Sequence, residues 1–366
     1  MSPHDVAAAL GAYGLAGTMW DLPTKPLAAD AWPTLLNTVT TQRYPGFLLQ
    51  AIHDGALAAT EQQREQAEDA HETSMILALV LERHLLGVNA ALSGAGVDHR
   101  VLKGSAYAAL VYPDPALRSF GDVDLLVAGA DFDTAVTTLA EHGYHRVWPQ
   151  IREGYDARFG KGATLRDDTD IEVDLHRTFT LGPFGLTVDA GAVLAEVAEF
   201  HLGGVVLRAL GPDMMFMHAC YHAALGDWPP RTLALRDVAQ LLLACDVDEA
   251  RVLEVAAAWQ AEAVVAAAVQ MAWDTFRLAD VTRLSAWAAS YRPNPREAKM
   301  LATYTGERRS HTAKSLASLR VIPGLRAKAA FLRASLFPTR DFVDSRSASR
   351  AAWVRRGLRQ AGKGQR

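Results

Sequence analysis

The segment Asp122–Val127 (DVDLLV) constrains the fold of this chain more than any other stretch. It alternates polar and apolar residues and then becomes wholly apolar, which is typical of a central strand covered on both faces. Alternate side chains of a strand share one face, so Asp122 and Asp124 project together. Adjacent carboxylates repel each other unless a cation neutralises them, and Mg²⁺ suits them because it prefers hard oxygen ligands. Exposed strand ends also carry such pairs, so the motif alone is not specific.

A second alternating stretch, Ile171–His176, supplies further acids. Its odd-numbered residues form an apolar face, whereas Glu172, Asp174 and His176 share the other face. If this strand neighbours the first, one of its acids completes a set of three carboxylates. Such a set can bridge two metal ions for in-line attack at phosphorus. The alternative for this strand is a solvated face. His176, which shares a face with Asp174, lines the acceptor pocket or is a satisfied structural histidine.

The tripeptide Lys103-Gly104-Ser105 stands where an expected strand at 99–102 turns into an expected helix at 105–111. Glycine lets the backbone approach a phosphate, and the free N–H groups of a helix start favour an anion. Lys103 would add a positive charge to such a site. Ser105 is equally suited to a plain helix cap, and the spacing is not that of a Walker A loop.

The hydrophobic period divides the chain into four predicted parts. Residues 1–98 have helical periodicity, 99–210 alternate between strands and helices, 211–318 return to helices, and 319–366 form a basic tail. The predicted fold class is therefore α+β, a small mixed sheet with helices flanked by helical regions on both sides. Strands are expected at 99–102, 122–127, 144–148, 163–166 and 170–176.

The tail from Arg320 to Arg366 has twelve Lys or Arg residues and two acids, a charge of about +10. Since the chain carries −4 in total, the remainder carries about −14. A tail of this kind can reach nucleic acid or another anionic partner. It can equally fold back on the acidic body and act as a solubilising segment.

We expect a cytoplasmic protein without a membrane partner. The N-terminus lacks a basic leader followed by a long apolar core, and no window approaches roughly 18 uninterrupted apolar residues. The two cysteines, Cys220 and Cys245, fit neither a metal spacing nor a disulfide framework. Reduced, buried thiols are the expectation for both.

Taken together, the motifs resemble the DNA polymerase β-type nucleotidyltransferase superfamily, and more closely a family of uncharacterised bacterial nucleotidyltransferases. That family has a Leu-Lys-Gly turn, a Tyr-x-x-Pro segment, an Arg shortly before Asp-hydrophobic-Asp-Leu-Leu-Val, and a later Asp-Leu-His. The resemblance covers roughly Leu79–Leu243, although the spacing from Gly104 to Asp122 is longer than in minimal superfamily members. The matching residues are Leu102-Lys103-Gly104, Tyr112–Pro115, Arg118, Asp122–Val127, Asp174–His176, His218, His222, Trp228 and Arg236-Asp237.

This resemblance implies a polymerase β-like core that transfers a nucleoside monophosphate from an NTP to an acceptor hydroxyl and releases pyrophosphate. Asp122, Asp124 and Asp174 would bind two Mg²⁺ ions, for which Mn²⁺ can substitute, and Asp174 would also serve as the base. The nucleotide, expected to be ATP, would be bound by Lys103, Gly104, Ser105 and Arg118.

Several of these residues have a plainer alternative. Arg118 binds the triphosphate or forms a structural salt bridge to the acidic pair. His218 and His222 lie four residues apart on one helix face. They line an acceptor pocket, belong to the core, or bind a metal, although the glutamate of H-E-x-x-H is absent. Asp237 contacts the acceptor or pairs with a nearby arginine on a helix surface.

The motifs leave the acceptor open. An enzyme acting on a small molecule or a peptide is favoured, and one acting on RNA ends or on a protein, as toxin-like relatives do, would use the basic tail. A non-catalytic module of the same fold that binds a nucleotide or a partner is a third interpretation. A metal-dependent hydrolase that uses the histidines is a fourth.

Overall fold

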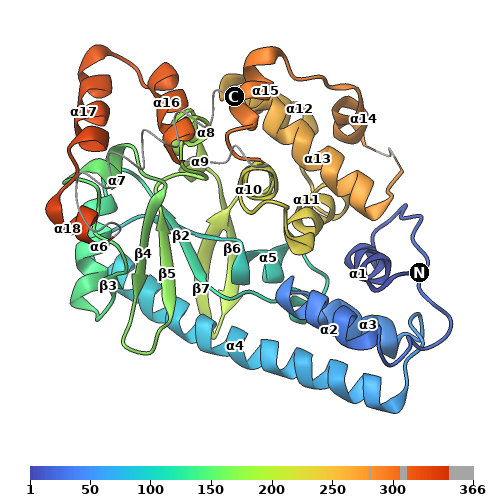
Figure 1. The fold of residues 1–366 in the computed structure, drawn as a ribbon. Coiled ribbons are helices and arrows are strands. Elements are labelled where there is room, and N and C mark those ends of the chain that lie inside the picture. The colour runs from blue at the N-terminus through green and yellow to red at the C-terminus, as the bar shows by residue number, and fades with distance from the viewer. Residues whose placement is uncertain (280–281, 306–310, 346–366) are drawn as a thin grey trace.

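A mixed β-sheet lies at the centre of the protein. The computed structural model describes residues 1–279, 282–305 and 311–345. Within these residues the strands form one seven-stranded sheet in the order β3-β4-β5-β2-β1-β7-β6 (Figure 1). The strands are β1 (His99–Leu102), β2 (Val123–Val127), β3 (His145–Arg146), β4 (Gly162–Arg166), β5 (Glu172–His176), β6 (Val197–Leu202) and β7 (Val205–Leu210).

Strand β2 occupies the position that its apolar run predicts. It pairs with β1 in antiparallel and with β5 in parallel orientation, and all five of its residues are buried. The register sets Asp124 opposite Asp174. The two acidic strands are therefore neighbours, which is the condition for a shared set of carboxylates.

The hairpin β4–β5 brings the second acidic strand into the sheet. Its turn is closed by Asp167, whose Oδ1 accepts hydrogen bonds from the backbone N–H groups of Thr169 and Ile171. Asp170 adopts the left-handed conformation with φ of 64°, which short polar residues tolerate. This polar turn separates the two strands as expected.

The hairpin β6–β7 extends the sheet beyond β1 and was not indicated by the sequence pattern. Its turn contains Gly203 and Gly204, both at positive φ. Val197, Val205 and Val206 are exposed, so apolar residues lie on both faces and the alternation that marks a half-buried strand is diluted. The remaining expected strands are present, with β3 reduced to two residues.

Four helices precede the sheet, and the last of them is long. Helix α4 (Glu61–Gly94) runs along one edge of the molecule beneath the sheet and the other three (Figure 1). It begins with a capping box, in which Thr60 Oγ1 accepts from Gln63 N–H and the Gln63 side chain accepts from Thr60 N–H. The other three are α1 (Pro3–Ala12), α2 (Trp32–Thr41) and α3 (Pro45–His53).

By length and composition alone, α4 is the one helix among the described residues that could cross a membrane, and 28% of its apolar window is buried. One such helix is weak evidence, because core helices of soluble proteins meet the same criterion. Leu81, Leu85, Val88 and Leu92 form its buried face.

Helices also follow the sheet. Helix α10 (Pro212–Leu225) is buried almost all round, as expected of a helix in the centre of a helical layer. It packs against α11 (Thr232–Ala244) and α13 (Glu262–Phe276). The other helices of this part are α12 (Glu249–Ala258), α14 (Arg283–Ser290), α15 (Pro295–Leu301), α16 (His311–Val321), α17 (Leu325–Leu336) and α18 (Arg340–Asp344). Short helices within the core are α5 (Gly104–Leu110), η1 (Pro115–Leu117), α6 (Phe132–Glu141), α7 (Tyr155–Arg158), α8 (Pro183–Leu186) and α9 (Ala190–Ala195).

The α+β class predicted from the sequence is confirmed. One hydrophobic core runs from Val6 to Tyr304 through both helical regions and the sheet. A smaller cluster fixes α17, where Phe331 packs against the rings of Tyr155 and Phe159. The four-part division stays a prediction, and its last limit falls inside α16. Residues 346–366 of the predicted basic tail lie outside the described residues.

Candidate active site

The two acids that the β2–β5 register sets side by side form a compact group with a histidine. Ligand atoms of Asp124, Asp174 and His176 all lie within 4.8 Å of one another. His176 Nε2 donates to Asp124 Oδ1 at 2.8 Å, and Thr164 Oγ1 donates to Asp174 Oδ1 at 2.5 Å. This group could hold a metal ion.

The donor set fits a divalent cation. Two carboxylates supply hard oxygens of the kind that Mg²⁺ and Mn²⁺ prefer, and an imidazole is a ligand for many divalent metals. Asp122 is not part of this group, and its carboxylate lies 3.4 Å from Arg43 Nη1 and 3.8 Å from Lys103 Nζ. Of the three predicted carboxylates, Asp124 and Asp174 thus belong to the group with His176, and the metal-ligand role of Asp122 stays a prediction.

Lys103 stands between the two aspartates of the D-x-D motif. Its Nζ lies 2.7 Å from Asp124 Oδ2 and 3.8 Å from Asp122 Oδ2. The backbone turns into α5 with Lys103 at φ 30° and Gly104 at φ 43°, a left-handed bend that sends the lysine into the site. Burial would raise the pKa of Asp124, but the Lys103 ammonium and the His176 hydrogen bond lower it well below its usual range. Asp124 is therefore an anion at neutral pH.

A second half-buried lysine, Lys161, was not predicted to belong to the site. It precedes β4, and burial followed by repulsion from Lys103 lowers the pKa of its ammonium group. The charges of Asp124 and Asp174 act in the opposite direction. No local pattern marks this residue, because an isolated lysine before a strand has no distinctive spacing.

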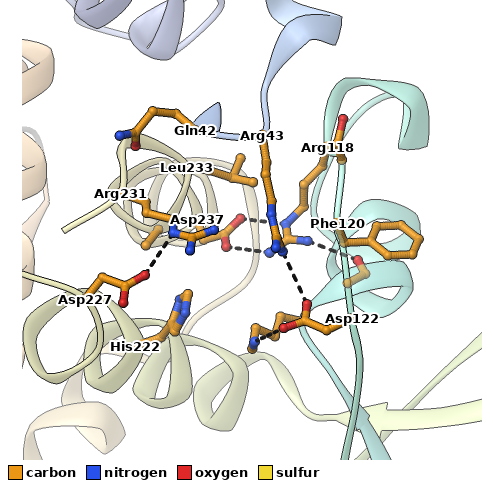
Figure 2. A pocket seen from close by; sticks show the side chains of 14 residues that line it. Gln42, Arg43, Arg118, Phe120, Asp122, His222, Asp227, Arg231, Leu233 and Asp237 are labelled. Carbon is orange, nitrogen blue, oxygen red and sulfur yellow. Dashed lines mark hydrogen bonds and ion pairs between the residues drawn. The ribbon is translucent and has the colours of Figure 1, made fainter. Parts of the chain in front are cut away.

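A cavity of about 130 Å³ opens beside Asp122 (Figure 2). Arg43 extends across it from the loop between α2 and α3, and its Nη1 lies 3.4 Å from Asp122 Oδ1. A Cβ on Gly121 would lie 2.7 Å from the Arg43 guanidinium, so only glycine leaves room for this close approach. The cavity is lined by Gln42, Arg43, Lys103, Gly104, Arg118, Ser119, Phe120, Asp122, His222, Asp227, Arg231, Leu233, Ala234 and Asp237.

Arg118 and Asp237 form a buried ion pair in the wall of this cavity (Figure 2). Arg118 Nε and Nη2 donate to the two carboxylate oxygens at 2.8 and 2.7 Å, and Tyr112 Oη donates to Asp237 Oδ1 at 2.7 Å. Arg118 therefore makes no salt bridge to the acidic pair, which was its alternative role. The prediction that Asp237 pairs with a nearby arginine on a helix surface is also wrong, because its carboxylate is buried and pairs with Arg118.

The two histidines of α10 have different surroundings. His222 lines the cavity, and burial together with the Lys103 charge lowers the pKa of its imidazole well below the usual range. His218 lies in the core, where its Nδ1 is 3.0 Å from Tyr107 Oη and its ring packs against Phe179. Among the described residues neither belongs to a group that could hold a metal. Of these two histidines, only His222 lines the cavity.

Of the predicted phosphate turn, Lys103-Gly104-Ser105, one part also lines the cavity and another does not. Gly104 lines the cavity, whereas Ser105 is buried in the first turn of α5. The positive charges around the cavity come instead from side chains: Lys103 and Arg43 at the acids, and Arg231 at the far rim, where its Nε lies 2.8 Å from Asp227 Oδ2. The site is thus a metal-ligand group next to a pocket with several cationic side chains, each of them paired with an aspartate.

Comparison with known proteins identifies the family of this chain. A family model described as "Uncharacterised nucleotidyltransferase" matches residues 28–277, which is more than half of the chain. No curated protein matches significantly. Among solved structures, an antigenic nucleotidyltransferase-like protein from Paracoccidioides brasiliensis is similar at 14% identity, over 46% of this chain and 74% of that one. Its TM-score of 0.27 is too low to carry an argument.

Proposed function

Because the chain belongs to the family of uncharacterised nucleotidyltransferases, we propose that it transfers a nucleoside monophosphate from an NTP to an acceptor hydroxyl. The observation that carries this proposal is the group of Asp124, Asp174 and His176 beside a pocket with several cationic side chains. An NTP needs both features: ligands for its divalent cation and positive charge for its phosphates. We take Mg²⁺ as the cation, ATP as the nucleotide and the cytoplasm as the compartment.

Each residue then has a defined part in the reaction. Asp124 and Asp174 hold the divalent cation with His176 nearby, and a cation bound there acts as a Lewis acid on phosphate oxygens. Lys103 and Arg43 bind the triphosphate from the two sides of Asp122. Their charges stabilise the negative charge that builds up on the leaving pyrophosphate.

Asp174 accepts the proton of the acceptor hydroxyl. The hydroxyl oxygen forms a bond to the α-phosphorus while the bond to pyrophosphate breaks, so that the acceptor carries the nucleoside monophosphate. Thr164 donates a 2.5 Å hydrogen bond to Asp174 Oδ1 and so orients this carboxylate. A small molecule or a peptide is the acceptor class that we favour.

Transfer is tested with each α-³²P-labelled NTP in the presence of cell extract, with and without Mg²⁺. We expect label on an acceptor only when Mg²⁺ is present, and the labelled species identifies the acceptor class. The same samples are measured by calorimetry for Mg²⁺-dependent NTP binding. A protein that neither transfers label nor binds an NTP in the presence of Mg²⁺ is not a nucleotidyltransferase.

Arg43→Ala is expected to weaken NTP binding about tenfold or more, because a charge-assisted hydrogen bond contributes about 1.5–3 kcal/mol. The thermal midpoint should change little, since 36% of the Arg43 side chain is exposed. Titration calorimetry with a non-hydrolysable NTP analogue measures the effect. Arg64→Ala is the control, because Arg64 pairs with Glu61 on exposed α4. Equal affinity of both variants would remove Arg43 from the binding site.

A further inference from the structure

The exposed face of α4 has an apolar centre. Ile76, Leu77, Leu79 and Val80 are 57%, 42%, 67% and 40% exposed, although the opposite face of the same helix is buried under the sheet. Ile76, Leu79 and Val80 lie within about 100° of one another around the helix axis, and Leu77 borders them. Such a group of apolar side chains on one surface indicates an interaction site rather than chance exposure. In Figure 1 this helix lies at the edge of the molecule, where no other described element covers its outer side.

Charged residues bracket this apolar centre at equal distances. Glu72 and Arg83 are both exposed. At 100° per residue they lie within about 20° of each other around the helix, on the same stripe as Ile76 and Leu79. Each is about 8 Å along the helix axis from the midpoint between residues 77 and 78. A two-fold axis through that midpoint, perpendicular to the helix, would therefore place Glu72 of one copy opposite Arg83 of a second copy.

We propose that this face joins two copies of the chain through an antiparallel α4–α4 contact. A two-fold axis at the midpoint sets Ile76 of one copy against Leu79 of the other, and Glu72 against Arg83 at both ends. The result is an apolar centre with a charged rim, which is the usual composition of a protein interface. No residue of α4 lines the cavity beside Asp122.

The distribution of charge along α4 selects the antiparallel orientation and disfavours other occupants. The first twelve residues contain five acids and one arginine, whereas the last twelve contain Arg83 as their only formal charge. A parallel pair would set the two acidic segments side by side, and like charges repel. The same acids disfavour an anionic membrane surface as the occupant.

The test is the mass of the full chain in solution over a concentration series, measured by light scattering and sedimentation. We expect a reversible dimer that Leu79→Asp converts to a monomer. Glu72→Arg and Arg83→Glu should each raise the dissociation constant about tenfold, because each creates two like-charge contacts. The double variant should return to the wild-type value, since the swapped charges attract again.

Leu332→Asp on α17 is the matched control, because Leu332 is as exposed as Val80 and lies on a different helix. All of these side chains are exposed, so circular dichroism should show that every variant is folded. A wild-type chain that is monomeric at every concentration would overturn the proposal, as would a double variant no tighter than the single ones. Binding of the monomer to lipid vesicles through Leu79 would overturn it too, and assign the face to a membrane.

Discussion

Asp124→Asn lowers the rate of nucleotidyl transfer by about three orders of magnitude, equivalent to about 4 kcal/mol of transition-state stabilisation, if Asp124 is a metal ligand. The amide keeps the size of the side chain but loses the negative charge that both the cation and Lys103 require. Asp122→Asn is expected to have a clearly smaller effect, because Asp122 lies outside the metal-ligand group and its carboxylate faces Arg43. Single-turnover rates and Mg²⁺ affinities measure the two losses separately.

Asp170→Asn is the matched control for this experiment. Asp170 lies in the β4–β5 turn, its side chain is 87% exposed, and asparagine tolerates its left-handed backbone. Its activity should equal that of the unchanged protein. Equal losses for the Asp122 and Asp124 variants would contradict the unequal roles that the geometry assigns to the D-x-D motif.

Asp237→Ala is expected to lower the free energy of unfolding by about 3–5 kcal/mol, because it leaves the Arg118 guanidinium buried without a partner. Tyr112 loses its hydrogen-bond acceptor at the same time. Urea denaturation of the purified protein measures the loss. This effect does not depend on the reaction that the protein catalyses.

The cavity itself provides the control, because it holds a second Arg–Asp pair on its rim. Asp227 and Arg231 are 54% and 40% exposed, and breaking such a solvated pair costs about 0–1 kcal/mol. Asp227→Ala should therefore unfold at nearly the same urea concentration as the unchanged protein. Similar midpoints for the two variants would show that the Arg118–Asp237 pair contributes no more than a surface pair.

Local patterns were sufficient to predict the part of the site that lies on neighbouring strands. The alternation in 122–127 and 171–176 indicated which residues share a face, and the β2–β5 register followed from burying the apolar ones. The same reasoning placed Lys103 at a strand–helix turn but not its direction, because direction depends on a left-handed bend at that residue. Strand periodicity contains no information about such a bend.

Residues that meet across long sequence separations could not be predicted. Arg43 reaches Asp122 over 79 positions and Arg118 reaches Asp237 over 119, and neither pair has a local pattern. Arg118 and Asp237 were singled out only through the resemblance. The alternative partners expected for them were the acidic pair for Arg118 and a nearby arginine for Asp237, whereas the two residues pair with each other. Arg43 and Lys161 were missed altogether, since they lie outside every recognised motif.

The long sequence separations between residues of the site also affect the order in which its parts form as the chain folds. The two acids come together when β2 pairs with β5 in the sheet. The cavity is complete only after the α2–α3 loop and α11 have also packed against the core, because residues of both line it. Contacts between distant segments require the most loop closure and are expected to form late. A fragment limited to the sheet would thus have the acids without the pocket. Binding of a nucleotide at the cavity then reports that the segments from residue 42 to residue 237 have come together, and the bound ligand selectively stabilises that state.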